Sequence, residues 1–119
     1  MSQPEFDGIT PIFSVSDVAA ALSFYRDRLG FEIGWTWGDP PTHANVCRGR
    51  IDITLTAKSE AAGSGHAYIT VRDVDAYFAE LRGRNVACGD LADQAYGMRD
   101  FSVVDPSGNR IVFGQAVAG

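Results

Sequence analysis

The chain contains the same local pattern twice, and this repeat constrains the fold more than any other feature. Apolar runs lead into VSDV at residues 15–18 and into VRDV at residues 71–74. Asp is a favourable helix N-cap, and apolar residues recur at helical spacing after each of the two. Because the predicted order of elements also agrees, we interpret the chain as a duplicated β-α-β-β-β module.

The first module covers about residues 8–57. Its helix begins after Asp17, and Gly30 stands where a C-cap glycine is expected. Its strands are predicted at residues 9–15, 31–37, 43–48 and 51–57. The polar stretch 58–65, KSEAAGSG, is a linker between the modules.

The second module covers about residues 66–115, so we expect residues 1–119 to form a single α+β domain. Its helix follows Asp73 and ends at Gly83. Strands are predicted at residues 66–71 and 85–88, a loop at 89–95, and a hairpin around the DPSGN turn at 105–109. Alternation places apolar residues on one face of each strand, under the helices, and mixed polar residues on the other, concave face.

Composition restricts the partners. A net charge of −5 and a pI of about 4.8 argue against a nucleic-acid partner. The acidity suits a cationic small molecule, although solubility alone also explains it. No apolar stretch is long enough to cross a membrane, and the N-terminus lacks a signal-peptide pattern. Cys47 and Cys88 match no metal or redox spacing, so we expect buried thiols in a cytoplasmic protein.

Several motifs resemble those of the vicinal oxygen chelate superfamily, which includes glyoxalase I, extradiol dioxygenases and bleomycin resistance proteins. They are FYRDRLGF at 24–31, HAYITVRDVD at 66–75 and DPSGN at 105–109. The segments YGMRDF at 96–101 and RGRIDI at 48–53 are most similar to the bleomycin resistance branch. The resemblance implies two β-α-β-β-β modules whose curved mixed sheet surrounds a cleft, usually in a homodimer.

The resemblance also implies where a metal would bind. Metal-dependent members carry four ligands on the concave face, at positions that correspond here to Thr10, Asp52, His66 and Val112. Threonine is a poor ligand and valine cannot ligate, which leaves Asp52 and His66 as weak candidates. His43 is the only other histidine. We therefore expect no metal cofactor, with a divalent metal at a divergent site as the alternative.

Aromatic residues offer a different kind of site. Phe31, Ile33, Trp35 and Trp37 are predicted to share one face of one strand. We expect the first two in the core and the tryptophans in an aromatic wall, or alternatively in a dimer interface. Arg99 and Arg110 could pair with Asp100 or Asp52, or contact an anionic ligand. The full set of candidate ligand-binding residues is Trp35, Trp37, Asp52, His66, Tyr68, Tyr96, Met98, Arg110 and Val112.

These observations favour a metal-free protein that sequesters a planar or cationic small molecule in a cleft at a homodimer interface, without catalysis. The alternative is a metal-dependent lyase, isomerase or dioxygenase with a divergent site. A third possibility is a domain that acts through dimerisation alone. The linker at 58–65 permits the modules to pair within one chain or between subunits.

Overall fold

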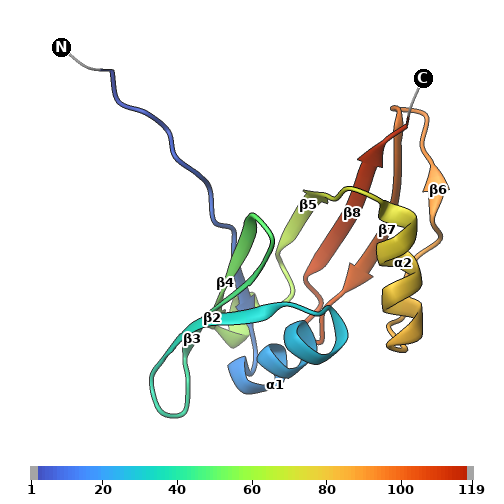
Figure 1. The fold of residues 1–119 in the computed structure, drawn as a ribbon. Helices are drawn as coiled ribbons and strands as arrows, with labels where there is room; N and C mark the ends of the chain where they lie inside the picture. Colours follow the sequence, from blue (N-terminus) through green and yellow to red (C-terminus); the bar gives the residue numbers. More distant parts are fainter. Residues whose placement is uncertain (1–2, 118–119) are drawn as a thin grey trace.

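The computed structural model describes residues 3–117 and shows two four-stranded mixed sheets (Figure 1). The first has the order β1-β4-β3-β2, and the second has the matching order β5-β8-β7-β6. In each sheet the first two strands are parallel and the other pairs antiparallel. The strands are β1 (Ile12–Val15), β2 (Glu32–Trp37), β3 (His43–Arg48), β4 (Ile51–Ala57), β5 (His66–Thr70), β6 (Ala92–Asp93), β7 (Met98–Val104) and β8 (Arg110–Ala116). The duplicated α+β fold predicted from the repeat is thereby confirmed.

Both predicted helix starts are confirmed. In the first module, α1 (Val18–Ser23) begins after Asp17, whose carboxylate accepts a hydrogen bond from the Ala20 N–H at 3.1 Å. The chain continues as a π-helical turn, Phe24–Arg28, before Gly30 reverses it with a φ of 75°. In the second module, α2 (Val74–Gly83) is capped in the same way by Asp73. A short 3-10 turn, Ser59–Ala61, interrupts the linker.

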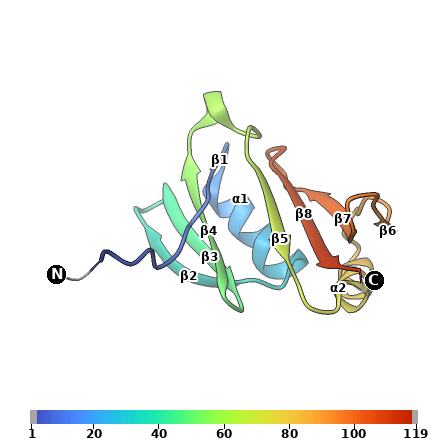
Figure 2. The ribbon, with the colours of Figure 1, turned by 90° about the horizontal axis from the view of Figure 1, so that it is seen from above.

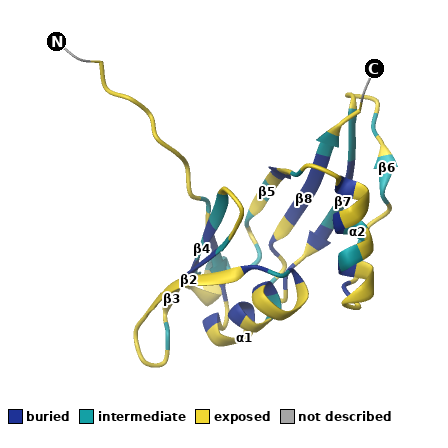
Figure 3. Ribbon diagram, in the orientation of Figure 1, coloured by how far each residue is buried: buried dark blue, intermediate teal, exposed yellow. Residues whose placement is uncertain are grey.

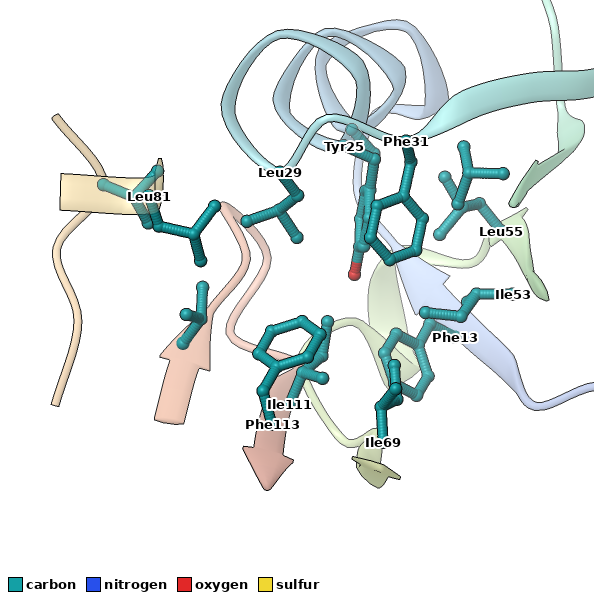
Figure 4. Packing of buried hydrophobic residues seen from close by; sticks show 14 of the residues in the cluster. Phe13, Tyr25, Leu29, Phe31, Ile53, Leu55, Ile69, Leu81, Ile111 and Phe113 are labelled. Atoms are coloured by element: carbon teal, nitrogen blue, oxygen red, sulfur yellow. The ribbon is translucent and has the colours of Figure 1, made fainter. Parts of the chain in front are cut away.

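The two modules share one hydrophobic core, with α1 lying between the sheets (Figure 2). Tyr25 and Leu29 from the first module lie opposite Phe113 and Leu81 from the second (Figure 4). Each sheet therefore turns its apolar face inward, as the alternation predicted. The polar faces of the two sheets consequently lie on the outside of the molecule and do not face one another.

The strand predictions are wrong in three places. The first strand begins at Ile12 rather than at residue 9, because Pro11 has no N–H to continue the ladder with β4. Residues 85–88 form no strand, since Asn85 turns the chain with a φ of 60° and only Cys88 forms a bridge, to Val103. The edge strand of this sheet is instead β6, inside the predicted loop.

A buried polar cluster in the DPSGN turn joins the modules. The Asp105 carboxylate accepts hydrogen bonds from the Tyr25 hydroxyl and from the backbone and side-chain N–H groups of Asn109, each at 2.9 Å. The Asn109 amide also donates to the Ser14 carbonyl at 2.9 Å and accepts from the Gly65 N–H at 2.7 Å. The turn of the second module thus holds β1, the π-helical turn and the linker together.

We expect Asn109→Ala to lower the free energy of unfolding by about 2–4 kcal/mol, because it leaves the Gly65 N–H without its acceptor and removes one hydrogen bond each from the Ser14 carbonyl and the Asp105 carboxylate. Urea unfolding followed by circular dichroism measures the loss. Ser23→Ala is the control, since it removes an exposed hydroxyl that caps no backbone group and should change stability by less than about 0.5 kcal/mol. A loss below about 1 kcal/mol for Asn109→Ala would contradict the role of the cluster.

Candidate functional site

A cavity of about 480 Å³ opens on the polar face of the second sheet. This volume lies within the range of small-molecule sites. Strands β5, β7 and β8 supply its floor, and the turn between β6 and β7 supplies one side. Its lining residues are His66, Tyr68, Asp90, Gln94, Tyr96, Asp100, Phe101, Ser102, Arg110 and Val112.

Asp100 is the central charged group of this cavity, and only 4% of its surface is exposed. One carboxylate oxygen accepts hydrogen bonds from the hydroxyls of Tyr96 at 2.6 Å and Tyr68 at 2.9 Å. The other oxygen accepts from the Gln94 amide at 3.1 Å. A buried carboxylate with three donors is stabilised in its charged form.

The hydrogen bonds shift the pKa values of this cluster. Burial opposes ionisation of Asp100, but the hydrogen bonds from Tyr96, Tyr68 and Gln94 outweigh it and hold the pKa of Asp100 below its ordinary value. Nearby Arg110 acts in the same direction. Loss of hydration and the hydrogen bond to Asp100 raise the pKa of Tyr68 to about 12. The cavity therefore presents a fixed negative charge framed by neutral phenols.

Gly114 is required beneath Tyr68. Gly114 lies on β8, paired with Asp100 on one side and Thr70 on the other. A Cβ at this position would collide with the hydroxyl and ring of Tyr68. The absence of a side chain at Gly114 lets the Tyr68 ring cross β8 and reach Asp100.

The two tryptophans lie on the first sheet, on the strand β2. All six residues of β2 are exposed, which is visible as its yellow ribbon in Figure 3. A register shift between Ile33 and Trp35 breaks the predicted alternation. Ile33 pairs with buried Val46, whereas Trp35 pairs with Asn45, whose side chain lies on the polar face. We predicted that Phe31, Ile33, Trp35 and Trp37 point to one face of the sheet. This prediction is wrong, because the bulge at Gly34 turns the side chains after it to the opposite face.

This bulge exposes both indole rings on the polar face. Trp35 is 48% exposed and Trp37 is 67% exposed, whereas Phe31 is buried. Trp37 makes an edge contact with the His43 ring, whose centroid is 5.6 Å away. Ile33, which we expected in the core, is 38% exposed because β2 lies at the edge of the sheet.

Asp52 lies on the same polar face as the tryptophans. Its carboxylate accepts hydrogen bonds from the Thr10 hydroxyl at 3.1 Å and the Asn45 amide at 2.9 Å. The strand register makes Asp52 the counterpart of Arg110, and Thr54 the counterpart of Val112. The strand register therefore differs from the expectation drawn from the family resemblance, which placed Asp52 at one of the four metal-ligand positions.

The structure brings together five of the nine predicted site residues. His66, Tyr68, Tyr96, Arg110 and Val112 line the cavity of the second sheet. The other four do not join them within one chain, since Met98 lies outside the lining and the rest belong to the first sheet. Those three residues are Trp35, Trp37 and Asp52.

Sequence reasoning missed Asp100 as a site residue and considered it only as an arginine partner. Arg99 does not pair with it, because Arg99 points to the other side of β7 and binds Asp75 at 3.0 Å and Asp93 at 3.1 Å. One signal was available. Asp100 and Ser102 alternate with the apolar residues Phe101 and Val103, which places a carboxylate on the polar face of the strand.

The residues at the four family ligand positions do not fit a metal ion. Thr10 donates its hydroxyl to Asp52, and Val112 offers only methyl groups to the cavity. Within residues 3–117, no three His, Cys, Asp or Glu side chains gather closely enough to hold a metal. A protein site normally needs three or more such ligands.

Comparisons with known proteins extend over the whole chain. A family model described as "Glyoxalase superfamily protein" matches residues 1–119. The bleomycin-binding protein of Streptomyces verticillus, solved with copper(II)-bleomycin, is 32% identical with a TM-score of 0.80, covering 98% of this chain and 99% of that one. TnmS3, an antibiotic binding protein from Streptomyces sp. CB03234, is 26% identical with a TM-score of 0.76, covering 95% and 99%. The bleomycin resistance protein of Geobacillus stearothermophilus is 26% identical, covering 90% of this chain and 95% of its own.

The hydrogen bonding of Tyr68 to Asp100 leads us to expect a loss of folding stability at alkaline pH. Because the folded state raises the pKa of Tyr68 from 10.0 to about 12, it keeps a proton that the unfolded chain loses in this interval. This contribution to stability is complete below pH 10 and is lost as the pH rises through about 12. In Asp100→Asn, ultraviolet absorbance of tyrosinate should show Tyr68 titrating at lower pH.

Tyr68→Phe assigns the titration step in this experiment. Asp90→Asn is the matched control, since Asp90 lines the same cavity and makes no hydrogen bond to a tyrosine within the described residues. An unchanged tyrosine titration in Asp100→Asn would refute the proposed coupling.

Proposed function

Because this chain belongs to the glyoxalase superfamily over its full length, we propose that it is an antibiotic-binding protein that sequesters a bleomycin-like ligand. The observation that carries the proposal is the pair of exposed tryptophans on the polar face of β2. The fold does not need them there, because the core closes without them. Exposed indole rings are suited to stacking on planar or cationic groups.

The comparisons support this ligand class. The Streptomyces verticillus relative carries copper(II)-bleomycin in its structure, and TnmS3 is described as antibiotic binding. Both cover nearly all of this chain. The buried carboxylate of Asp100 and that of Asp52 would complement positive charge on such a ligand.

We also propose that the binding cleft forms in a homodimer. The tryptophans and the Asp100 cavity lie on different sheets, whose polar faces point outward. A two-fold axis would place the β2 face of one copy opposite the β7–β8 face of its partner and would form two equivalent clefts. Exposed apolar side chains on these faces, such as Trp35 and Tyr68, would then be covered.

Binding without catalysis and without a resident metal belongs to the same proposal. It is supported by the poor ligand chemistry of Thr10 and Val112 and by the saturated hydrogen bonding of Asp100. No helix of the described chain has the length and apolar character that a membrane span requires. Cys47 and Cys88 are free thiols, which is consistent with the cytoplasmic location we propose. Both are partly exposed, so the expectation that they are buried is wrong.

We expect metal-free bleomycin to bind with a dissociation constant at or below the micromolar range, measured by isothermal titration calorimetry and by tryptophan fluorescence. The chain has two tryptophans, so the fluorescence reports only on Trp35 and Trp37. Trp35→Ala and Asp100→Asn should each weaken binding by at least ~10-fold, because one removes a stacking surface and the other a buried charge.

Val104→Ala is the control for these variants, since it shortens an apolar side chain that is 54% exposed and outside the cavity. It should leave binding unchanged. The absence of heat and of a fluorescence change up to about 100 µM ligand would reject bleomycin-like ligands.

Elemental analysis of the purified protein tests the absence of a resident metal. We expect less than ~0.1 transition metal per chain, and the same bleomycin affinity after dialysis against a chelator. One tightly held metal per chain that is lost in His66→Ala, but kept in His43→Ala, would support metal-dependent chemistry instead.

A further inference from the structure

Two opposite charges line the Asp100 cavity without an ionic partner. They are the guanidinium of Arg110 and the carboxylate of Asp90, and both side chains are exposed. Neither forms an ion pair with another residue between 3 and 117. The equivalent of Arg110 on the first sheet differs, since Asp52 is satisfied by hydrogen bonds within the chain. The two charges of the cavity are therefore available to a ligand.

Arg110 does not neutralise Asp100, the buried carboxylate of the same cavity. Both carboxylate oxygens already accept hydrogen bonds, which come from Tyr96, Tyr68 and Gln94. Arg110 is close enough to favour the charged form of Asp100, but it forms no ion pair with it. The planar guanidinium group therefore keeps its donors for another acceptor, and a carboxylate can take two of them at once.

The strand order places the two free charges on opposite sides of the cavity floor (Figure 1). Arg110 begins β8 and is the register partner of His66 on β5. Asp90 lies on the far side of β7, because the preceding residue, Gly89, donates its N–H to the Ser102 carbonyl at 2.8 Å. β7 thus separates the two residues, and two strand spacings correspond to roughly 10 Å.

The floor between the charges suits a flat apolar group. Val112 follows Arg110 by two residues, so both lie on the same face of β8. The register places Tyr68 on one side of Val112 and Ser102 on the other. The Tyr68 ring is 44% exposed and is held by its hydrogen bond to Asp100. A ring lying over Val112 would have one end near each free charge.

We propose that this cavity binds a dipolar small molecule, whose acidic group pairs with Arg110, whose ammonium group pairs with Asp90 and whose planar part lies over Val112. The inference rests on the proposed function, since it takes the Asp100 cavity as part of the ligand site, and it names the ligand class more closely. Exposed ion pairs are individually weak. A rigid molecule that spans both charges binds more tightly than either half, because the second contact forms within the complex.

Titration of the isotopically labelled full chain, followed by NMR, tests the proposal with para-aminomethylbenzoate. This flat molecule carries a carboxylate and an ammonium group at opposite ends of one ring. The matched probes are para-methylbenzoate and benzylamine, each of which keeps only one of the charges. We expect para-aminomethylbenzoate to bind in the millimolar range or better, at least ~10-fold more tightly than either matched probe. It should shift the amide signals of Asp90, Ser102 and Val112.

Two neutral variants assign the ends of the probe. Arg110→Gln should reduce the affinity for para-aminomethylbenzoate to that for benzylamine, and Asp90→Asn should reduce it to that for para-methylbenzoate. Arg72→Gln is the matched control, since it removes an exposed guanidinium group that lies outside the cavity and has no ionic partner within residues 3–117. It should leave the affinity unchanged.

The decisive variant exchanges the two charges by combining Arg110→Glu with Asp90→Arg. Each reversal alone should remove the ~10-fold advantage of the dipolar probe. The combined variant should restore it, because the probe can bind with its ends reversed. Amide signals outside the cavity show whether each variant is folded, and the two neutral variants decide the question if the exchanged chain does not fold.

The remaining outcomes separate this inference from the proposed function. Equal binding of the three probes, or binding of none, would overturn the dipolar site, and bleomycin binding in that case would leave the proposed function standing. Tight binding of para-aminomethylbenzoate without binding of bleomycin would support the dipolar site and reject the bleomycin class. Binding that is unaffected by Arg110→Gln and Asp90→Asn would place the probe elsewhere and overturn the assignment.

Discussion

The relative position of the two modules depends on the hydrogen bonds of Asp105 and Asn109. A linker of eight small and polar residues does not by itself fix the relative position of the modules. The buried carboxylate of Asp105 and the amide of Asn109 fix that arrangement, because β1, the π-helical turn and the linker each form a hydrogen bond with one of them. An unsatisfied buried polar group is costly, so these bonds are met in only one docking of the modules.

That docking decides where the functional surfaces lie. Because both sheets turn their apolar faces to one core, each polar face is left open to solvent. One face offers exposed indole rings and the other offers a buried carboxylate framed by tyrosines. The chain keeps these two candidate surfaces apart, which is why we propose that the complete cleft forms only between two copies.

The sequence predicted the modules, the helix caps and the facing of most strands, because period two and the Asp caps are local signals. It did not predict the bulge at Gly34, since the close contact with Asn45 that a glycine allows depends on the neighbouring strand. The DPSGN segment was recognised as a turn, but nothing local shows that Asp105 and Asn109 are buried. The role of Asp100 likewise depends on Tyr68 and Gly114, which only the strand register brings beside it.

The outward direction of the two polar faces has a genetic consequence. In a two-fold pair, each cleft would take one wall from each copy, so defects in different walls complement each other. A mixed pair of a chain lacking Trp35 and a chain lacking the Asp100 charge would contain one cleft with both walls intact and one with both altered. Two inactive alleles expressed together would then restore part of the binding capacity.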